Sequence, residues 1–203
     1  MQLSNQSEDQ AIVRYTESRL VRTSIRFSLF LVPSSFMPEE RVLFWLTINM
    51  SIALLLTAIN YLLWKINQKN RVRYFSLHSL VMMTGMAFYS MSPVFKGLFP
   101  SMLFWVLLGT VVVFCILLFS NADAIGAAFL NPQKKVFKYV ILFYAGILLF
   151  IGTLFWFFLF VTNTPSWIGI AVIFFFIGVF FLMVSPAMLI TPERAKELAS
   201  GRN

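Results

Sequence analysis

Long, uninterrupted runs of apolar residues dominate the chain and predict helices that cross a membrane. After Lys138 no Asp, Glu, Lys, Arg or His occurs until Glu193, and the main polar break in that run is 162–166. A spanning helix needs roughly 20 apolar residues, so this run predicts two spans joined by a tight turn. Backbone groups in lipid must pair with one another, which allows only helices or a closed barrel. Runs such as 174–176 do not alternate as barrel strands would, so we expect helices.

The same pattern predicts an all-α integral membrane protein with a bundle of five transmembrane helices. Trp45 and Trp64 lie near the two ends of the first span, which suits aromatic residues at the headgroup level. Thr191-Pro192 is typical of the start of a short C-terminal helix, with Thr as the cap and Pro at the first position. The expected spans are about 43–64, 75–92, 102–120, 136–160 and 167–189.

The N-terminal region is expected to lie outside this bundle. Residues 12–31 interleave four arginines with apolar side chains, a pattern that favours an amphipathic helix at the membrane surface. Residues 1–40 would then form a tail and this interfacial helix, 41–190 the transmembrane domain and 191–203 a C-terminal tail. The apolar patch at 27–37 leaves a shallow or re-entrant insertion open, although it is too short for a straight span.

Composition and charge support a membrane class and indicate an orientation. The 203 residues are 59% hydrophobic and carry a net charge of +8. In the five-span arrangement, the side that holds the 65–73 loop and the C-terminus carries more Lys and Arg, which favours a cytoplasmic C-terminus. The N-terminal arginines would then face outward, whereas a sixth crossing through 27–37 would bring them inside. We expect a multi-pass protein of the plasma membrane.

The basic side chains beside the spans are expected to contact anionic lipid headgroups. Nucleic acid is not an expected partner, because no basic patch sits on a soluble domain. The lipid-surface candidates are Arg14, Arg19, Arg22, Arg26, Lys65, Lys69, Arg71 and Arg73.

Two predicted spans carry stripes of small or polar residues. Asn49, Ala53, Thr57 and Asn60 share one face of the first span. Such a face normally packs against another helix, with its amides bonding across, and the alternative is a polar lining for a solute path. The last span places three small residues seven apart, which favours close packing of a further helix. These residues are Ala171, Gly178 and Ser185.

The second span offers the only candidate metal ligands. His78, Met82 and Met86 share one face, and imidazole and thioether groups can ligate copper(I) or haem. Methionine is also an ordinary apolar filler, and no second His exists to complete a pair. We therefore expect no bound metal or cofactor, and keep copper or haem binding as a second alternative function.

Absences along the chain argue against catalysis. None of the 8 acidic residues lies in a predicted span, whereas ion-coupled transport usually needs an ionisable group at membrane depth. No phosphate-binding loop, serine-hydrolase elbow or zinc-protease motif is present, and no motif indicates a family. We expect a non-catalytic accessory, scaffolding or regulatory subunit, with a membrane-protein partner or further copies of itself. The alternative is a transporter or channel for a neutral or organic solute.

Overall fold

The computed structural model describes residues 13–130 and 166–191, together with 142, 144, 146, 149–150, 152–154, 157, 161, 193–195 and 197. Within this part of the chain every regular element is a helix, as expected. The elements are η1 (Tyr15–Glu17), α2 (Leu20–Phe36), α3 (Val42–Ile66), α4 (Arg71–Leu98), α5 (Met102–Ser120), α6 (Ala122–Leu130), α8 (Ser166–Val184) and η2 (Ser185–Leu189). Among the described residues three helices are long and apolar enough to cross a membrane, Val42–Ile66, Met102–Ser120 and Trp167–Leu189. Most of the predicted 136–160 span lies outside the described residues.

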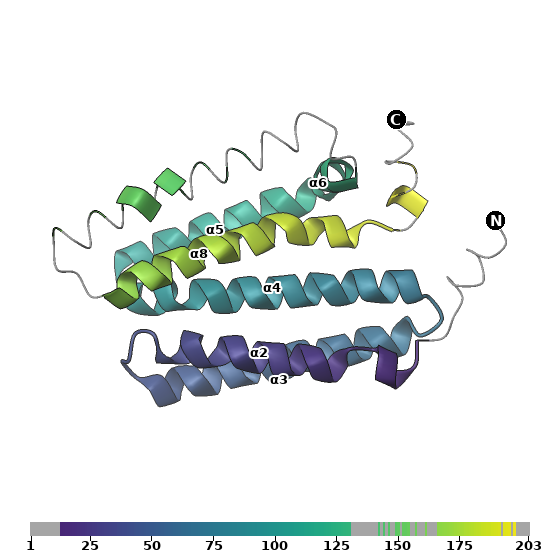
Figure 1. Cartoon of the computed structure of the whole chain (residues 1–203), viewed down its shortest axis with the longest axis horizontal. Coiled ribbons are helices and arrows are strands. Elements are labelled where there is room, and N and C mark those ends of the chain that lie inside the picture. Colours follow the sequence, from purple (N-terminus) through teal and green to yellow (C-terminus); the bar gives the residue numbers. More distant parts are fainter. Residues whose placement is uncertain are drawn as a thin grey trace.

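The helices form three layers with α4 in the middle (Figure 1). On one side of α4, α2 and α3 make an antiparallel pair, and on its other side lies α8 with α5 beside it. The short helix α6 lies at the end of the bundle that also holds η2 and the residues before α2. The layering therefore encloses α4 along its length between the two outer layers.

The central position of α4 explains why its sequence is the most polar of the long helices. Ser90, Ser92 and Lys96 are all buried on it, against neighbouring helices. The sequence pattern predicted that this span ends at Ser92, but the helix continues through Pro93 to Leu98. A proline inside a helix removes one backbone hydrogen bond and normally kinks or ends it. Here the helix persists because its last turns, Lys96 included, are packed inside the bundle.

The N-terminal segment joins the bundle instead of lying apart from it. α2 packs against α3 and α4 and buries Leu20 and Phe27. Just before α2, the backbone N–H of Val13 donates to the Gln68 carbonyl at 2.9 Å, and Trp64 Nε1 donates to the Val13 carbonyl at 3.0 Å. These bonds place Val13 and η1 at the same end as the α3–α4 connection (Figure 1). The expectation that the N-terminal helix lies outside the bundle is therefore wrong, whereas the number of spans stays a prediction.

The physical reason for this correction is the way α2 distributes its side chains. A surface helix would turn its apolar face into the membrane and its charges to water. In α2 the hydroxyl groups of Thr23, Ser34 and Ser35 are buried in the bundle. Its outward-facing side chains include a run of exposed apolar residues, which are Val21, Ile25, Leu29, Val32 and Phe36. The sequence pattern did not predict that this helix joins the bundle, because its apolar residues form a stripe on the outward face and not one continuous run along the chain.

Two glycines on α4 and α8 mark close approaches between long helices. A Cβ built on Gly85 of α4 would lie 2.7 Å from Phe27 of α2 and 2.7 Å from Leu56 of α3, so three helices meet there. A Cβ on Gly178 of α8 would lie 2.8 Å from the backbone oxygen of Ala87 on α4. Small residues at such points let helices approach closely. Both hydrophobic clusters of the core form around these crossings.

The C-terminal part of the described chain is tied to the start of α4. Arg73 Nη1 donates to the Leu189 carbonyl at 2.7 Å, and the Ser76 hydroxyl donates to the Met188 carbonyl. Thr191 Oγ1 accepts a hydrogen bond from the Arg194 N–H at 3.3 Å, so Thr191 caps the C-terminal segment as the sequence predicted. The α3–α4 connection and the end of η2 thus lie at one end of the bundle.

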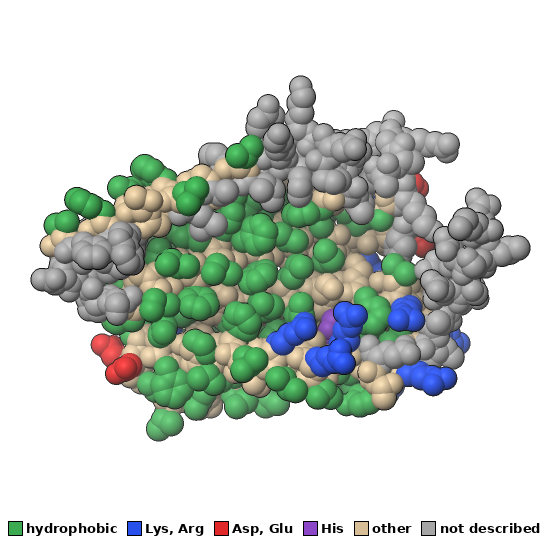
Figure 2. Space-filling model, viewed as in Figure 1, with side chains coloured by type: hydrophobic (Ala, Val, Ile, Leu, Met, Phe, Trp, Pro, Cys, Tyr) green, Lys and Arg blue, Asp and Glu red, His purple; other side chains and the backbone are tan. Residues whose placement is uncertain are grey.

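The two ends of the bundle differ in charge. Most basic side chains gather at the end that holds η1 and the α3–α4 connection, and acidic side chains are visible at both ends (Figure 2). Hydrophobic side chains cover most of the surface between them (Figure 2). The described basic residues towards the first end are Arg14, Arg19, Arg22, Arg26, Lys65, Lys69, Arg71, Arg73 and Arg194, with the acidic Asp123, Glu193 and Glu197. Those towards the second end are Arg41 and Lys96, with the acidic Glu39 and Glu40.

Candidate functional site

A network of buried polar groups follows the inner faces of α2, α3 and α4. Its first part lies at the less basic end, around Lys96. The Lys96 ammonium donates to the carbonyls of Ser34 at 3.1 Å, Ser35 at 2.6 Å and Pro38 at 3.4 Å. It also lies 5.7 Å from the ring centre of Trp45, within the range of a cation–π interaction. A cation from α4 thus satisfies the carbonyls at the C-terminal end of α2, which have no partner inside their own helix.

Asn49 of α3 extends this part of the network. Its Nδ2 donates to the Ser34 hydroxyl at 3.2 Å and to the Ser35 hydroxyl at 2.9 Å. The Tyr89 hydroxyl on α4 donates to the Asn49 backbone carbonyl at 2.9 Å. Together these bonds connect α2, α3 and α4 at one level, and all four residues are buried.

The second part of the network lies closer to the basic end, around His78. His78 is 4% exposed, and its Nε2 is hydrogen-bonded to the Thr23 hydroxyl of α2 at 2.9 Å. One turn earlier on α4, the buried Tyr74 hydroxyl donates to the Ser18 carbonyl. The helix pair α2–α3 is joined nearby by a hydrogen bond between the hydroxyls of Ser24 and Thr57.

Asn60 lies at the same level as Thr23 and His78. The antiparallel register set by Asn49 with Ser34 and Tyr89 places Asn60 opposite Thr23 on α2 and His78 on α4. Asn60 is 1% exposed, yet neither atom of its amide has a hydrogen-bond partner among the described residues. His78 Nδ1 and the Ser90 hydroxyl are also buried without one. Buried polar groups are normally paired with protein or ordered water, so the Asn60 amide is unusual among the described residues.

The span-one stripe therefore has two different environments. Asn49 bonds across to α2 as a packing residue would, and Ala53 packs with Phe27, Leu31 and Tyr89. Thr57 is half-buried and also bonds to α2, whereas Asn60 has the unpaired amide. The stripe in the last span faces α4, with Ala171, Gly178 and Ser185 all buried.

The candidate metal ligands share the face of α4 that meets α2, but their surroundings do not suit a cation. Arg26 Nη1 lies 3.6 Å from the Met82 sulfur, in donating geometry. The positive charges of Arg19 and Arg26 also act on the His78 ring. Met86 packs against the core cluster around Phe27. Like charges at this distance repel a metal cation, and no group of three or more His, Cys, Asp or Glu gathers as metal ligands in the described part.

The predicted lipid-surface residues lie toward one end, and most of them are exposed. Arg19 and Arg71 both stack on the ring of Phe75, at 5.0 and 5.8 Å from its centre. Arg73 is half-buried and uses its guanidinium to hold the end of η2. Seven of the eight candidates are exposed at the surface, and their contact with headgroups stays a prediction.

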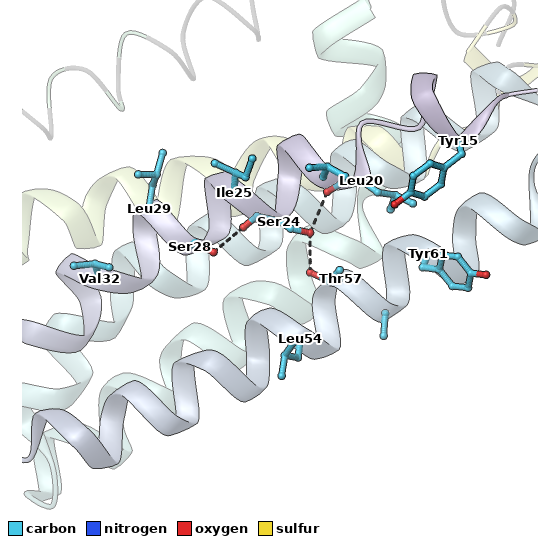
Figure 3. A pocket seen from close by; sticks show the side chains of 12 residues that line it. Tyr15, Leu20, Ser24, Ile25, Ser28, Leu29, Val32, Leu54, Thr57 and Tyr61 are labelled. Carbon is cyan, nitrogen blue, oxygen red and sulfur yellow. Dashed lines mark hydrogen bonds between the residues drawn. The ribbon is translucent and has the colours of Figure 1, made fainter.

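A groove opens between α2 and α3 on the outer side of the bundle (Figure 3). It has a volume of about 800 Å³ and runs along α2 from Leu20 to Val32. Its walls are largely apolar and its floor carries the hydroxyls of Ser24, Ser28 and Thr57 (Figure 3). The lining residues are Tyr15, Leu20, Val21, Ser24, Ile25, Ser28, Leu29, Val32, Leu54, Thr57, Ala58 and Tyr61.

Sequence reasoning missed Lys96 and its partners on α2. Lys96 lies between Pro93 and Pro100, which together suggested an exposed connection. The signal that could have found it was the combination of an isolated lysine with the adjacent serines at 34–35, since a buried cation needs polar partners.

Comparison of the chain with protein-family models, curated proteins and solved structures finds no match.

Proposed function

We propose that the protein is a non-catalytic subunit of a membrane complex, and that α5 is the helix through which it docks. The observation that carries this proposal is the contrast between α4 and α5. The polar groups of α4 are largely used to hold the chain's own helices together. α5 has 19 residues, all apolar or small except Thr110 and Ser120, and none of them is buried.

The surface of α5 also contains a position suited to a partner helix. Nothing described lies within 4 Å of a Cβ built on Gly109. Exposed small residues on a membrane helix permit a second helix to approach its backbone, and helix association in lipid depends on such close packing. The partner would be a membrane protein that presents a complementary apolar helix.

The proposed orientation puts the basic end in the cytoplasm. The positive-inside rule favours it, because the described Lys and Arg are concentrated at the end that holds the α3–α4 connection. The N-terminal residues, the α3–α4 connection and the C-terminal segment would all face the cytoplasm, at the plasma membrane. The basic side chains there would meet anionic headgroups.

Photo-crosslinking in native membranes tests the docking proposal. A photoreactive residue at Val113 on α5 should capture one defined membrane protein, or a second copy of this chain. The same residue at Leu29 on α2 is the matched control, because both positions are exposed and apolar. The substitution Gly109→Leu should reduce capture at Val113, and Gly146→Leu, another glycine with open space around it, should not. Capture of lipid alone from both positions would contradict the proposal.

A transporter for a small neutral solute is the second candidate function. The observation in its favour is that the amide of Asn60 on α3 and Nδ1 of His78 on α4 are both buried without a described hydrogen-bond partner. A solute path predicts that Asn60→Leu abolishes uptake of the solute into vesicles while the protein stays assembled. If Asn60→Leu and the parent take up neutral solutes equally slowly, at the rate of empty vesicles, this candidate fails.

A further inference from the structure

The groove between α2 and α3 exists because small side chains line the outer seam of this helix pair. Ser24, Ser28 and Ala58 leave space that larger side chains would fill, and Leu29 and Leu54 form the rims. The hydroxyl groups on the floor have partners within the protein. Ser24 donates to the Leu20 carbonyl at 3.0 Å, and Ser28 donates to the Ser24 carbonyl at 3.0 Å. The groove therefore offers an apolar ligand a surface without unpaired polar groups.

The length of the groove matches one leaflet of a bilayer. From Val21 to Val32 the α2 wall rises about 16 Å, at 1.5 Å per residue. The hydrocarbon core of a bilayer is about 30 Å thick, so the groove extends from one surface to about the midplane. Tyr15 and Tyr61 lie at the groove end nearest the N-terminus (Figure 3). Aromatic residues of this kind favour the headgroup level.

Both walls of the groove lead to a basic residue at that same end. On α2, Arg22 lies on the same helical line as Ile25 and Leu29. On α3, Lys65 lies one turn beyond Tyr61, on the line that starts at Leu54. Both basic side chains are exposed. An occupant with an apolar tail in the groove would thus have its polar end between two cations.

We propose that this groove binds one acyl chain of an anionic phospholipid from the leaflet at the basic end, with its headgroup held between Arg22 and Lys65. The apolar lining, the depth of one leaflet and the cations at one end together match this chemistry. A second copy of the chain docked in parallel through the same face would bring four cations together, which is unfavourable. The proposal rests on the proposed membrane location but not on the docking role of α5.

The test uses the full chain reconstituted in vesicles with a photoreactive lipid. The probes are a phosphatidylglycerol with a diazirine in one acyl chain and the matching phosphatidylcholine. We expect the phosphatidylglycerol probe to label the groove walls, mapped to peptides that contain Ile25 or Ala58, and the phosphatidylcholine probe to label them much less. Equal labelling by the two probes would overturn the anionic preference. Crosslinks from these walls to a second protein chain would overturn the lipid as occupant.

Two matched pairs of variants sharpen the test. Arg22→Gln with Lys65→Gln should weaken the apparent affinity for the phosphatidylglycerol probe about thirtyfold, which corresponds to about 2 kcal/mol for two basic residues near an anionic surface. Lys69→Gln with Arg71→Gln removes the same charge from the same end away from the groove, and should cause much less change. An equal loss from both double variants would reduce the site to general surface charge and contradict the proposal.

Filling the groove separates the acyl-chain site from the headgroup site. Ala58→Phe should abolish labelling by either probe, whereas Thr47→Phe, exposed on α3 outside the groove, should leave it intact. The charge variants lie on the surface, so they keep the proposal testable if Ala58→Phe fails to fold. A wrong membrane location would appear separately, as loss of the protein from membranes washed with alkaline carbonate.

Discussion

The ammonium of Lys96 donates to the Ser35 carbonyl at 2.6 Å, so a cation on the central helix caps the C-terminal end of α2. This contact joins two helices that are separated by α3 in the sequence. Lysine is rarely buried unless it is paired, and here three carbonyls and an aromatic ring surround it. The buried charge is therefore part of the attachment of α2 to the bundle.

Lys96→Met should destabilise the protein. Methionine keeps much of the apolar stem of lysine but leaves the carbonyls of Ser34 and Ser35 without their donor. Leaving a buried acceptor unpaired costs roughly 1–3 kcal/mol. Thermal unfolding in detergent measures the loss, and Arg41→Gln, an exposed cation at the same end, should unfold like the parent. Equal stability of all three proteins would show that the Lys96 contacts contribute nothing to the fold.

Asn49→Leu should weaken folding more than Asn60→Leu. Asn49 makes two hydrogen bonds to hydroxyls of α2, and bonds between membrane helices average about 0.6 kcal/mol with a maximum near 1.7. Asn60 has no partner among the described residues, so its replacement removes none of these bonds. Ala53→Leu should also be costly, at roughly 1–3 kcal/mol, because it overpacks a core of aromatic and aliphatic side chains. Unfolding temperatures in one detergent rank the three, and a larger effect at Asn60 than at Asn49 would contradict this ranking.

Gly178→Ala should destabilise more than Gly85→Ala. The new methyl group at 178 would meet backbone, the Ala87 oxygen at 2.8 Å, whereas at 85 it meets the ends of side chains that can rotate. Gly109→Ala on α5 is the control, since open space surrounds it. Alanine improves helix propensity at all three positions, so that gain cancels in the comparison. An unfolding temperature for Gly178→Ala at or above that of Gly109→Ala would show that the α4–α8 contact is loose.

The topology can be tested by labelling single cysteines in a Cys115→Ala background. Asn70→Cys and Ser7→Cys should react with an impermeant reagent from the same side of the membrane, because Val13 and Gln68 are joined at one end of the bundle. Glu40→Cys should react from the opposite side. Ser200→Cys is expected to react with the reagent from the same side as Asn70→Cys. Labelling of Ser7→Cys and Asn70→Cys from opposite sides would instead favour the five-span arrangement.

Much of the helical pattern could be predicted from the sequence because apolar run length is a local property. The span at 102–120 has the bounds that were expected, and α3 extends the predicted 43–64 span by only a few residues. The stripe with Asn49 and Ala53 was recognisable because its spacing is regular. These features depend on residues close together in the chain.

The role of α2 and the full length of α4 could not be predicted, because each depends on what surrounds the helix. Thr23 and Ser34 are favourable inside α2 only because His78 and Asn49 lie opposite them. Lys96 can be buried only because the carbonyl end of α2 faces it. Such pairs are far apart in sequence, and a single chain carries no signal that identifies them as partners.

The position of α4 in the middle layer has a consequence for how the protein is made. A helix that carries a histidine, several serines and a lysine enters a bilayer poorly on its own. The partners that bind these groups, α2 and α3, precede α4 in the chain and are synthesised first. We therefore expect α4 to insert only after the α2–α3 hairpin is in place, because the hairpin supplies the hydrogen-bond partners for the polar groups of α4. A nascent chain lacking residues 12–36 should leave α4 uninserted, which a protease-accessibility assay on the arrested chain would detect.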